Sequence, residues 1–221
     1  MSLLPLQNMK LVIFDFDGTI ADTSPGILDS HRFALSAMGR DVLPDDELRK
    51  FIGGNLLTTY INSLDFSEND ARKAVRIYRE RYAHEGVHMA ILYPGFKDAI
   101  QQLKHNGYMI GIATLKAESF AKQMVHELGI AEYIDVVCGM NAQDNLTKAD
   151  LVKQCCCLCN GALEETVLVG DSNNDWIGAT QAGVKFIGVT YGFGFKSGTE
   201  YEFCTVDKVS ELLDILMVQK I

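Results

Sequence analysis

Two carboxylates follow a short apolar run near the start of the chain, where residues 11–19 read LVIFDFDGT. The apolar run is typical of a strand buried in a parallel sheet. Carboxylates at the carboxyl end of such a strand lie where open α/β sheets bind their ligands. Because a carboxylate is costly to desolvate and adds nothing to a core, Asp15 and Asp17 indicate chemistry rather than packing.

Polar residues also follow later strands of the predicted sheet. Thr114 comes directly after the second strand, and Lys148 begins the helix after the third. The strand at 166–169 is followed by GDSNND, which contains Asp171 and Asp175. Since the carboxyl ends of parallel strands share one edge of the sheet, we expect these groups to converge on one crevice.

Several carboxylates in one crevice repel one another unless a cation neutralises them. Their hard oxygen atoms favour Mg²⁺, and a nearby lysine and hydroxyl would complete a site for phosphate. One carboxylate could attack phosphorus to form an aspartyl-phosphate. A second could protonate the leaving oxygen and then activate water.

Strand-like and helix-like segments alternate along most of the 221 residues. Strands are predicted at 10–14, 108–113, 134–137, 166–169, 186–189 and 203–206. Helices are predicted at 94–106, 118–128, 148–158, 174–182 and 209–218. This alternation predicts an α/β fold with a doubly wound, Rossmann-like parallel sheet and helices on both faces.

The segment 22–90 interrupts the alternation, because it carries helical patterns at 25–38 and 71–82 and no convincing strand. We interpret it as an α-helical cap domain inserted after the first strand. The α/β core domain would then comprise 1–21 and 91–221. An insert at this point can act as a lid over the site.

The motifs together resemble the four ordered motifs of the haloacid dehalogenase (HAD) superfamily. They are DFDGT at 15–19, Thr114, Lys148 and GDSNND at 170–175. The helical insert is similar to the cap of the phosphoglycolate phosphatase-like branch, and DGTIADT at 17–23 is close to that branch's opening. The resemblance covers nearly the whole chain and implies a HAD core with an inserted cap.

The resemblance implies a role for each catalytic residue. Asp15 would be the nucleophile, and Asp17 the general acid and base. Thr114 and Lys148 would hold the transferring phosphoryl group. The bound cofactor would be Mg²⁺, held by Asp15, Asp17 (through its carbonyl) and Asp171. Asp175 would support the metal or orient Lys148.

The residues expected around the phosphate or substrate are Gly18, Thr19, Thr114, Leu115, Lys148 and Gly53. Gly53 belongs to a glycine pair in the cap that could reach the distal end of the substrate, or form an ordinary turn. Leu115 departs from the family pattern, which often has Asn after the hydroxyl, so a polar contact is missing there. A glycine-rich loop at 191–195 is expected near the rim of the site.

Simpler interpretations exist for some of these residues. Asp171 and Asp175 could serve only to cap the following helix. Lys148 is assigned by position, and Lys153 or Lys116 could take its place.

We therefore expect a Mg²⁺-dependent phosphatase that hydrolyses a small phosphorylated metabolite, of the phosphoglycolate type, through an aspartyl-phosphate. The second aspartate, Asp17, favours phosphoryl transfer over dehalogenation, because halide needs no protonation. The alternatives are a phosphomutase of the β-phosphoglucomutase type, or a pyrophosphatase or nucleotidase of the same superfamily.

Composition limits the partners. The net charge of −9 disfavours binding to nucleic acid and to anionic membranes. No apolar stretch approaches the roughly 20 residues of a membrane span, and the first residues do not resemble a signal peptide. A cytoplasmic protein is expected, either a monomer or a homodimer.

Four of the six cysteines crowd at 155–157 and 159. Zinc sites usually contain two separated cysteine pairs, and no second pair exists here. We interpret these cysteines as small apolar residues on a helix, some of them prone to oxidation.

Overall fold

The computed structural model describes residues 8–141 and 145–217. The chain divides into two compact units: unit 1 comprises Met1–Asp22 and Leu92–Ile221, and unit 2 comprises Thr23–Ile91. The predicted domain junctions fall one residue earlier in each case. Residues 1–7, on which the signal-peptide expectation depends, and the predicted helix end at Val218 lie outside the described residues.

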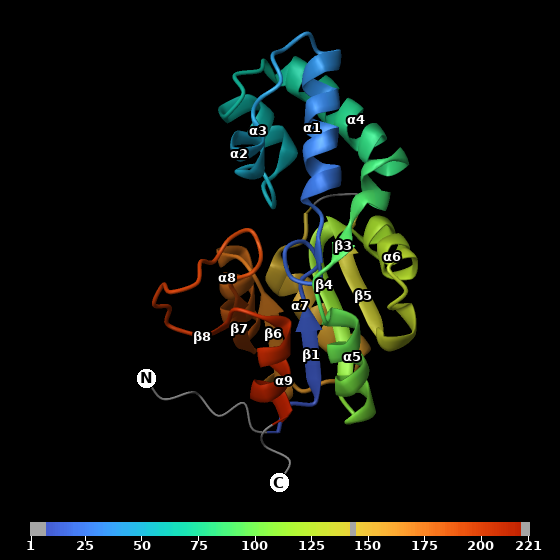
Figure 1. The fold of residues 1–221 in the computed structure, drawn as a ribbon, viewed down its shortest axis with the longest axis vertical. Coiled ribbons are helices and arrows are strands. Elements are labelled where there is room, and N and C mark those ends of the chain that lie inside the picture. Colours follow the sequence, from blue (N-terminus) through green and yellow to red (C-terminus); the bar gives the residue numbers. More distant parts are fainter. Residues whose placement is uncertain (1–7, 142–144, 218–221) are drawn as a thin grey trace. The chain divides into compact units, whose positions relative to one another are not determined.

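Unit 1 is built on a six-stranded sheet with the order β5-β4-β1-β6-β7-β8, in which neighbouring strands run parallel (Figure 1). The strands are β1 (Leu11–Phe14), β4 (Met109–Ala117), β5 (Val136–Met140), β6 (Thr166–Gly170), β7 (Lys185–Val189) and β8 (Cys204–Val206). From the central β1 the chain continues outward to β4 and β5, then returns to β6 on the other side of β1. This arrangement confirms the predicted doubly wound α/β fold and places the reversal of strand order beside β1.

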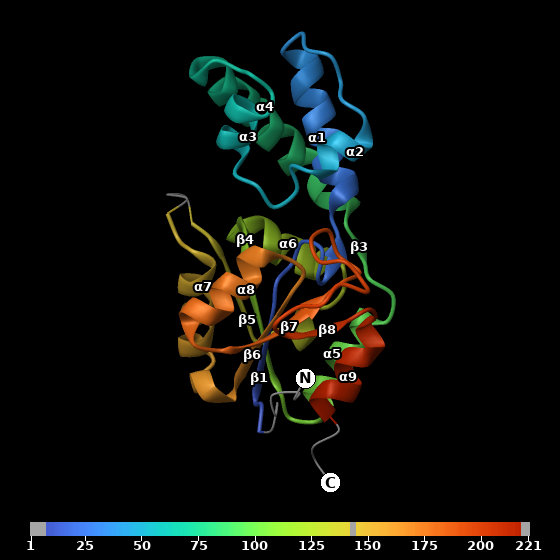
Figure 2. The same cartoon turned by 90° about the vertical axis from the view of Figure 1, so that its left-hand side faces the viewer.

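Helices cover both faces of this sheet. α5 (Phe96–His105) and α9 (Val209–Met217) pack together on one face, whereas α7 (Lys148–Leu158) and α8 (Asn173–Ala182) pack together on the other (Figure 2). α6 (Glu118–Glu127) contacts β4 and β5. Since β1 and β6 are buried along their whole length, the strands read as continuous apolar runs in the sequence.

β4 extends to Ala117, beyond the predicted end at residue 113. Its pairing with β5 is irregular between Ala113 and Ala117. Such bulges often lie next to functional sites, where they redirect side chains. The short strands β2 (Ala21–Asp22) and β3 (Ile91–Leu92) pair with each other and were not predicted, because two residues show no periodic pattern.

Unit 2 is helical. It contains α1 (Ser24–Ala37), α2 (Asp45–Arg49), α3 (Leu56–Asn62) and α4 (Glu68–His84), followed by a 3₁₀ turn at Gly86–Met89. The patterns at 25–38 and 71–82 correspond to α1 and α4, which pack against each other. α2 and α3 were not predicted, because five and seven residues are too short for a clear helical period.

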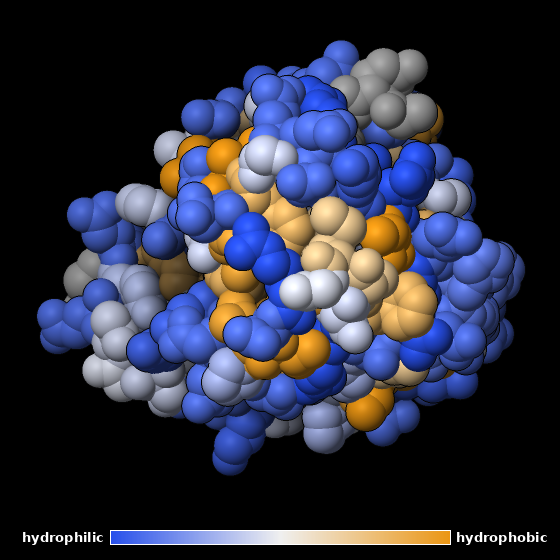
Figure 3. Space-filling view, turned by 90° about the horizontal axis from the view of Figure 1, so that it is seen from above, coloured by the Kyte–Doolittle hydropathy of each residue, from blue (hydrophilic) through white to orange (hydrophobic). Residues whose placement is uncertain are grey.

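The face of the molecule in Figure 3 is largely hydrophilic, with one area where apolar side chains gather.

Unit 2 contains a pocket of about 760 Å³. Its lining mixes apolar side chains such as Leu35 and Phe66 with the charged Arg40 and Lys50. Within the described part of the chain, no helix has the length and apolar character needed to cross a membrane.

A histidine occupies the core of unit 2. His31 is fully buried, its Nδ1 lies 3.2 Å from the hydroxyl of Tyr60, and its Nε2 has no hydrogen-bond partner. The rings of Phe51, Tyr60 and Tyr78 surround it. Burial lowers the pKa of His31 from 6.5 to about 4, because this apolar site disfavours the charged imidazolium.

We expect His31 to make unit 2 sensitive to acid. Its folded-state pKa lies below the unfolded value, so the unfolded chain binds more protons between pH 6.5 and about 4. The contribution of His31 to the free energy of unfolding should therefore fall as the pH falls through this window, by about 1.4 kcal/mol per pH unit and roughly 3 kcal/mol in total. Urea unfolding of the parent and of a variant without this histidine, at pH 7.0, 5.5 and 4.5, isolates the contribution as the difference between the two proteins.

The variant His31→Gln lacks the titrating group, so the stability of the parent relative to H31Q should fall between pH 7.0 and pH 4.5. His84→Gln, on the exposed end of α4, is the matched control and should keep the parent slope. Equal slopes in H31Q and the parent would contradict the assignment.

Candidate active site

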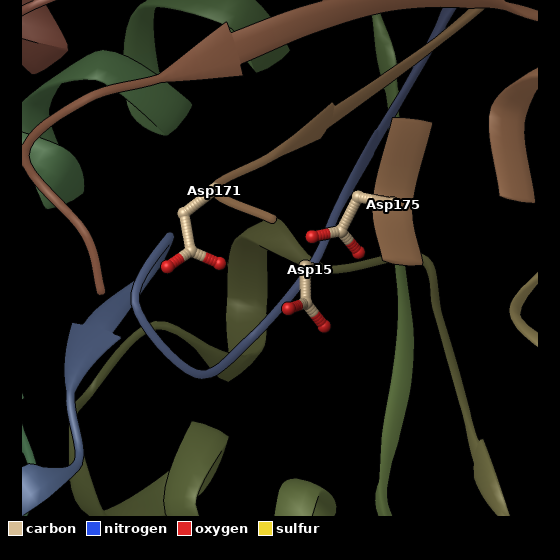
Figure 4. A group of neighbouring side chains, drawn as sticks. All are labelled: Asp15, Asp171 and Asp175. Atoms are coloured by element: carbon tan, nitrogen blue, oxygen red, sulfur yellow. The ribbon is translucent and has the colours of Figure 1, made fainter. Parts of the chain in front are cut away.

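Three carboxylates meet at the carboxyl edge of the sheet in unit 1 (Figure 4). Asp15 follows β1, Asp171 follows β6, and Asp175 lies in the first turn of α8. Each offers an oxygen atom, and these oxygen atoms all lie within 4.8 Å of one another. All three residues are buried, so their charges are only weakly screened by water.

Lys148 supplies a buried positive charge to this group. Its Nζ donates to Asp15 Oδ1 at 2.7 Å and to the carbonyl of Ala113 at 3.0 Å, and it lies 2.8 Å from Asp175 Oδ1. The lysine stem passes over Gly178 of α8, where a Cβ atom would lie only 2.4 Å from Lys148 Cγ. The ammonium group therefore joins β1, β4 and α8 to the start of α7.

The burial of these charges changes their ionisation. Burial, together with the charge of Asp175, raises the pKa of Asp15 to about 7, although Lys148 opposes the rise. Burial and the charges of Asp15 and Asp175 raise the pKa of Asp171 to about 8. Burial lowers the pKa of Lys148, but its ion pairs with the two aspartates outweigh that effect and the net shift is upward.

The glycine-rich loop after β7 holds Asp171 from the other side. The backbone N–H groups of Phe193 and Gly194 donate to Asp171 Oδ2 at 2.6 and 3.2 Å. Gly18 approaches the same oxygen atom, with φ at 80°, and a Cβ atom there would lie 2.3 Å from it. The predicted loop at 191–195 is thus part of the site, and its N–H groups are contacts that side-chain patterns did not reveal.

Asp17 has a different partner from the other carboxylates. Its Oδ1 lies 3.0 Å from Nζ of Lys116, whose side chain is only 7% exposed. From the sequence, Lys116 and Lys153 are alternatives to Lys148 as the lysine of the site. The structure gives Lys116 its own position beside Asp17, whereas Lys153 is exposed on α7.

Two hydroxyl groups lie buried among the predicted site residues. Thr19 is fully buried, and its Oγ1 has no hydrogen-bond partner. Thr114 lies in the irregular part of β4, where its Oγ1 accepts from the backbone N–H of Lys116 at 3.2 Å. A buried hydroxyl without a partner is costly unless a ligand or water satisfies it, so Thr19 is suited to bind a ligand.

The other predicted residues lie in more open positions. Leu115 is 37% exposed, in the irregular part of β4. Gly53 is exposed in unit 2, between α2 and α3, with φ at 78°. Contact of either residue with a substrate stays a prediction.

Asp175 also stabilises its own helix. Its Oδ2 accepts from the backbone N–H and the hydroxyl of Ser172, at 3.1 and 2.6 Å, in a capping box at the start of α8. Its other oxygen, Oδ1, faces Lys148. Asp175 can therefore cap α8 with one carboxylate oxygen and contribute to the site with the other.

A model of the haloacid dehalogenase-like hydrolase family matches residues 12–189 of this chain. A 5'-nucleotidase from Pseudomonas aeruginosa is 32% identical over 83% of this chain and 83% of its own length. A phosphoglycolate phosphatase from Vibrio parahaemolyticus is 28% identical over 96% of this chain and 98% of its own. The solved structure of a haloacid dehalogenase-like family hydrolase from Streptococcus pneumoniae superposes with a TM-score of 0.85 at 27% identity, covering 94% of this chain and 98% of that one.

The arrangement of charges can be tested through Lys148. Without a bound cation, the raised pKa values of Asp15 and Asp171 mean that stability is lost as the pH rises through about 7 and 8. Lys148→Met removes the cation that opposes this loss. In EDTA at pH 8, we expect the variant to be about 3–5 kcal/mol less stable than the parent, as when one partner of a buried ion pair is removed. The deficit should shrink at pH 5.5, where Asp15 and Asp171 are protonated.

Urea unfolding at both pH values measures this difference. Lys153→Met changes an exposed lysine on the same helix and should alter stability by less than about 0.5 kcal/mol. A K148M deficit that does not depend on pH would mean that lost packing, rather than lost charge, dominates.

Proposed function

Because this chain belongs to the haloacid dehalogenase-like hydrolase family, we propose that it is a Mg²⁺-dependent phosphatase that hydrolyses a small phosphomonoester through an aspartyl-phosphate on Asp15. The observation that carries the proposal is the position of Asp15. It lies at the end of β1, 2.7 Å from Lys148, with Asp17 two residues further along the chain. A nucleophile, a cation and a proton donor are therefore available at one sheet edge.

In the first step, a carboxylate oxygen of Asp15 attacks phosphorus while the bond to the leaving oxygen breaks. Lys148 fixes Asp15 Oδ1 through a hydrogen bond of 2.7 Å, which restricts the carboxylate to one orientation. The hydroxyls of Thr19 and Thr114 and the ammonium of Lys148 would hold the oxygens of the transferring phosphoryl group.

Asp17 would move the protons. As an acid it protonates the leaving alcohol oxygen, and as a carboxylate it then takes a proton from the water that hydrolyses the aspartyl-phosphate. Lys116, at 3.0 Å, is placed to orient the Asp17 carboxyl group between the two steps. The second step frees phosphate and returns Asp15 to its starting form.

The donor set supports Mg²⁺ at this site. Asp15, Asp171 and Asp175 offer hard oxygen atoms within 4.8 Å of one another, and the single ammonium of Lys148 balances only part of their charge. We assign these three side chains, with the Asp17 carbonyl, as the groups that would hold the ion. When bound, Mg²⁺ would offset the negative charge of the carboxylates and the phosphoryl oxygens.

The relatives support a phosphomonoester substrate. Both the 5'-nucleotidase and the phosphoglycolate phosphatase have names that describe hydrolysis of such esters. We therefore place this chain among cytoplasmic enzymes of small phosphorylated metabolites, and the net charge of −9 disfavours nucleic acid and anionic membranes as partners. We also propose that Gly53 of unit 2 contacts the substrate.

Phosphate release from phosphoglycolate, nucleoside 5'-monophosphates, sugar phosphates and pyrophosphate, with Mg²⁺ and with EDTA, tests the function. We expect Mg²⁺-dependent release from at least one monoester, and loss of turnover to background in Asp15→Asn because the amide is no nucleophile. Asp98→Asn, an exposed aspartate on α5, should retain parent activity. Full turnover in D15N, or no release from any monoester, would contradict the proposal.

Mg²⁺ binding should depend on pH. Without a cation, Asp15 and Asp171 hold protons up to about pH 7 and about pH 8, and the ion must displace them. The affinity should therefore rise about tenfold between pH 6 and pH 7 for each proton released. Calorimetric titration with MgCl₂, in two buffers of different ionisation enthalpy, measures both the affinity and the number of protons.

Asp171→Asn should remove the increase in melting temperature that Mg²⁺ gives the parent, whereas D98N should keep it. Binding without proton release between pH 6 and 7 would contradict the raised pKa values. The same affinity in D171N and the parent would remove Asp171 from the set of ligands.

A further inference from the structure

Tyr191 connects the glycine-rich loop at 191–195 to the turn that follows Asp15. Its hydroxyl donates to the backbone carbonyl of Thr19 at 3.1 Å, and the two residues are 172 positions apart in the sequence. Burial raises the pKa of Tyr191 above its ordinary value of 10, so the hydroxyl stays protonated. The Thr19 carbonyl needs such a donor, because a carbonyl oxygen can only accept.

The turn at 16–21 is closed by its own backbone. The carbonyl of Phe16 accepts three N–H groups, those of Thr19, Ile20 and Ala21, at 3.3, 3.0 and 3.3 Å. These bonds define the shape of the turn, but they leave the carbonyls of Thr19 and Ile20 for other partners.

Both of these carbonyls accept from outside the turn. Thr19 accepts from the Tyr191 side chain, whereas Ile20 accepts from the backbone N–H of Tyr93 at 3.1 Å. The rings of Tyr93 and Tyr191 contact each other, with their centroids 4.7 Å apart. The two bonds differ in kind, because any residue except proline could supply the N–H at position 93, whereas the bond from position 191 requires a side chain that donates.

The rest of the loop is fixed by contacts with Asp171. Besides the bonds from Phe193 and Gly194 to the carboxylate, the N–H of Phe195 donates to the Asp171 carbonyl at 2.8 Å. The side chain of Phe195 is buried and packs against three further rings, those of Phe186, Tyr201 and Phe203. The loop is therefore anchored by packing at one end, and Tyr191 lies at the other.

Gly192 brings the loop into direct contact with the turn. A Cβ atom at Gly192 would lie 2.3 Å from the carbonyl oxygen of Gly18 and 2.5 Å from Asp171 Cβ, so a larger residue does not fit there. Movement of the turn is therefore resisted at Gly18 by packing and at Thr19 by the hydrogen bond from Tyr191.

We propose that Tyr191 is a positioning residue, which holds the backbone of Thr19 so that the Thr19 hydroxyl binds an oxygen of the transferring phosphoryl group. This inference rests on the proposed phosphatase function. Thr19 Oγ1 is buried and has no hydrogen-bond partner. Because an unpaired buried hydroxyl costs free energy, the turn would gain by moving this hydroxyl to a partner unless its backbone is held. The bond from Tyr191 supplies that restraint, and the phosphoryl oxygen supplies the partner.

Tyr191→Phe removes the hydroxyl and keeps the ring that packs against Tyr93. We expect the dissociation constant of inorganic phosphate, measured by calorimetric titration in MgCl₂, to rise about fivefold, the size of one neutral hydrogen bond. The KM for a phosphomonoester should rise by the same factor. The kcat should change by less than about twofold, because the Thr19 contact is present in the bound ester and in the transition state alike.

Tyr201→Phe is the matched control. It also removes a tyrosine hydroxyl that is bound to the backbone, since this hydroxyl accepts from the N–H of Lys196 at 2.9 Å. Y201F should keep the parent constants. Y191F should keep the parent affinity for Mg²⁺, because the N–H groups that hold the Asp171 carboxylate belong to the backbone. Equal losses of Mg²⁺ and phosphate affinity in Y191F would show that the hydroxyl holds the whole loop, and would overturn its specific role at Thr19.

A double-mutant cycle tests whether Tyr191 acts through the Thr19 hydroxyl. Thr19→Ala removes that hydroxyl but keeps the carbonyl to which Tyr191 donates. In the T19A background, Y191F should change the phosphate affinity by less than about 1.5-fold, because the group that Tyr191 positions is absent. The same loss of affinity in both backgrounds would overturn the proposal.

Hydrogen exchange tests the restraint without catalysis. With no phosphate or Mg²⁺ added, a peptide that contains residues 16–21 should exchange about threefold faster in Y191F than in the parent, and at the parent rate in Y201F. A parent that hydrolyses no monoester would defeat the proposed function, while the exchange rates would still decide whether Tyr191 holds the turn. An active parent whose exchange and phosphate affinity are both unchanged in Y191F would overturn the positioning role and leave the proposed function standing.

Discussion

The buried ammonium group of Lys148 makes the rest of the site possible. Asp15, Asp171 and Asp175 lie within 4.8 Å of one another, and such carboxylates cannot all ionise in a buried place without a cation. Lys148 reaches Asp15 and Asp175 only because α7 begins at the carboxyl edge of the sheet and Gly178 of α8 leaves space for its stem. The order of the strands, with β1 between β4 and β6, brings these elements together.

The site was readable in the sequence wherever an apolar strand ends in polar residues. Asp15, Thr114 and Asp171 were located in this way, because burial on both faces leaves the strands as apolar runs and their ends as the first polar positions. The pairing of charges was not readable. Lys116 and Lys148 are both lysines near strand ends, and nothing in the sequence shows that the first pairs with Asp17 and the second with Asp15 and Asp175.

Contacts made by the backbone were also hidden from the sequence. Asp171 is held by N–H groups of Phe193 and Gly194, and any residue except proline carries such a group. The short helices α2 and α3 were missed for a related reason, since their apolar residues serve the packing of unit 2 and show no full helical period. A sequence pattern shows how apolar and polar side chains repeat along one helix or strand. The backbone contacts of Asp171 and the packing of α2 and α3 depend instead on several elements lying together.

The two ends of α7 lie in different surroundings. The interpretation of its cysteines as small apolar residues describes Cys155 and Cys156, which are buried in the core. It does not describe Cys157 and Cys159, which reach the surface at least in part. The first turn of the helix places Lys148 among carboxylates, where its charge must persist. The last turn places Cys155 in the core and leaves Cys159 partly exposed.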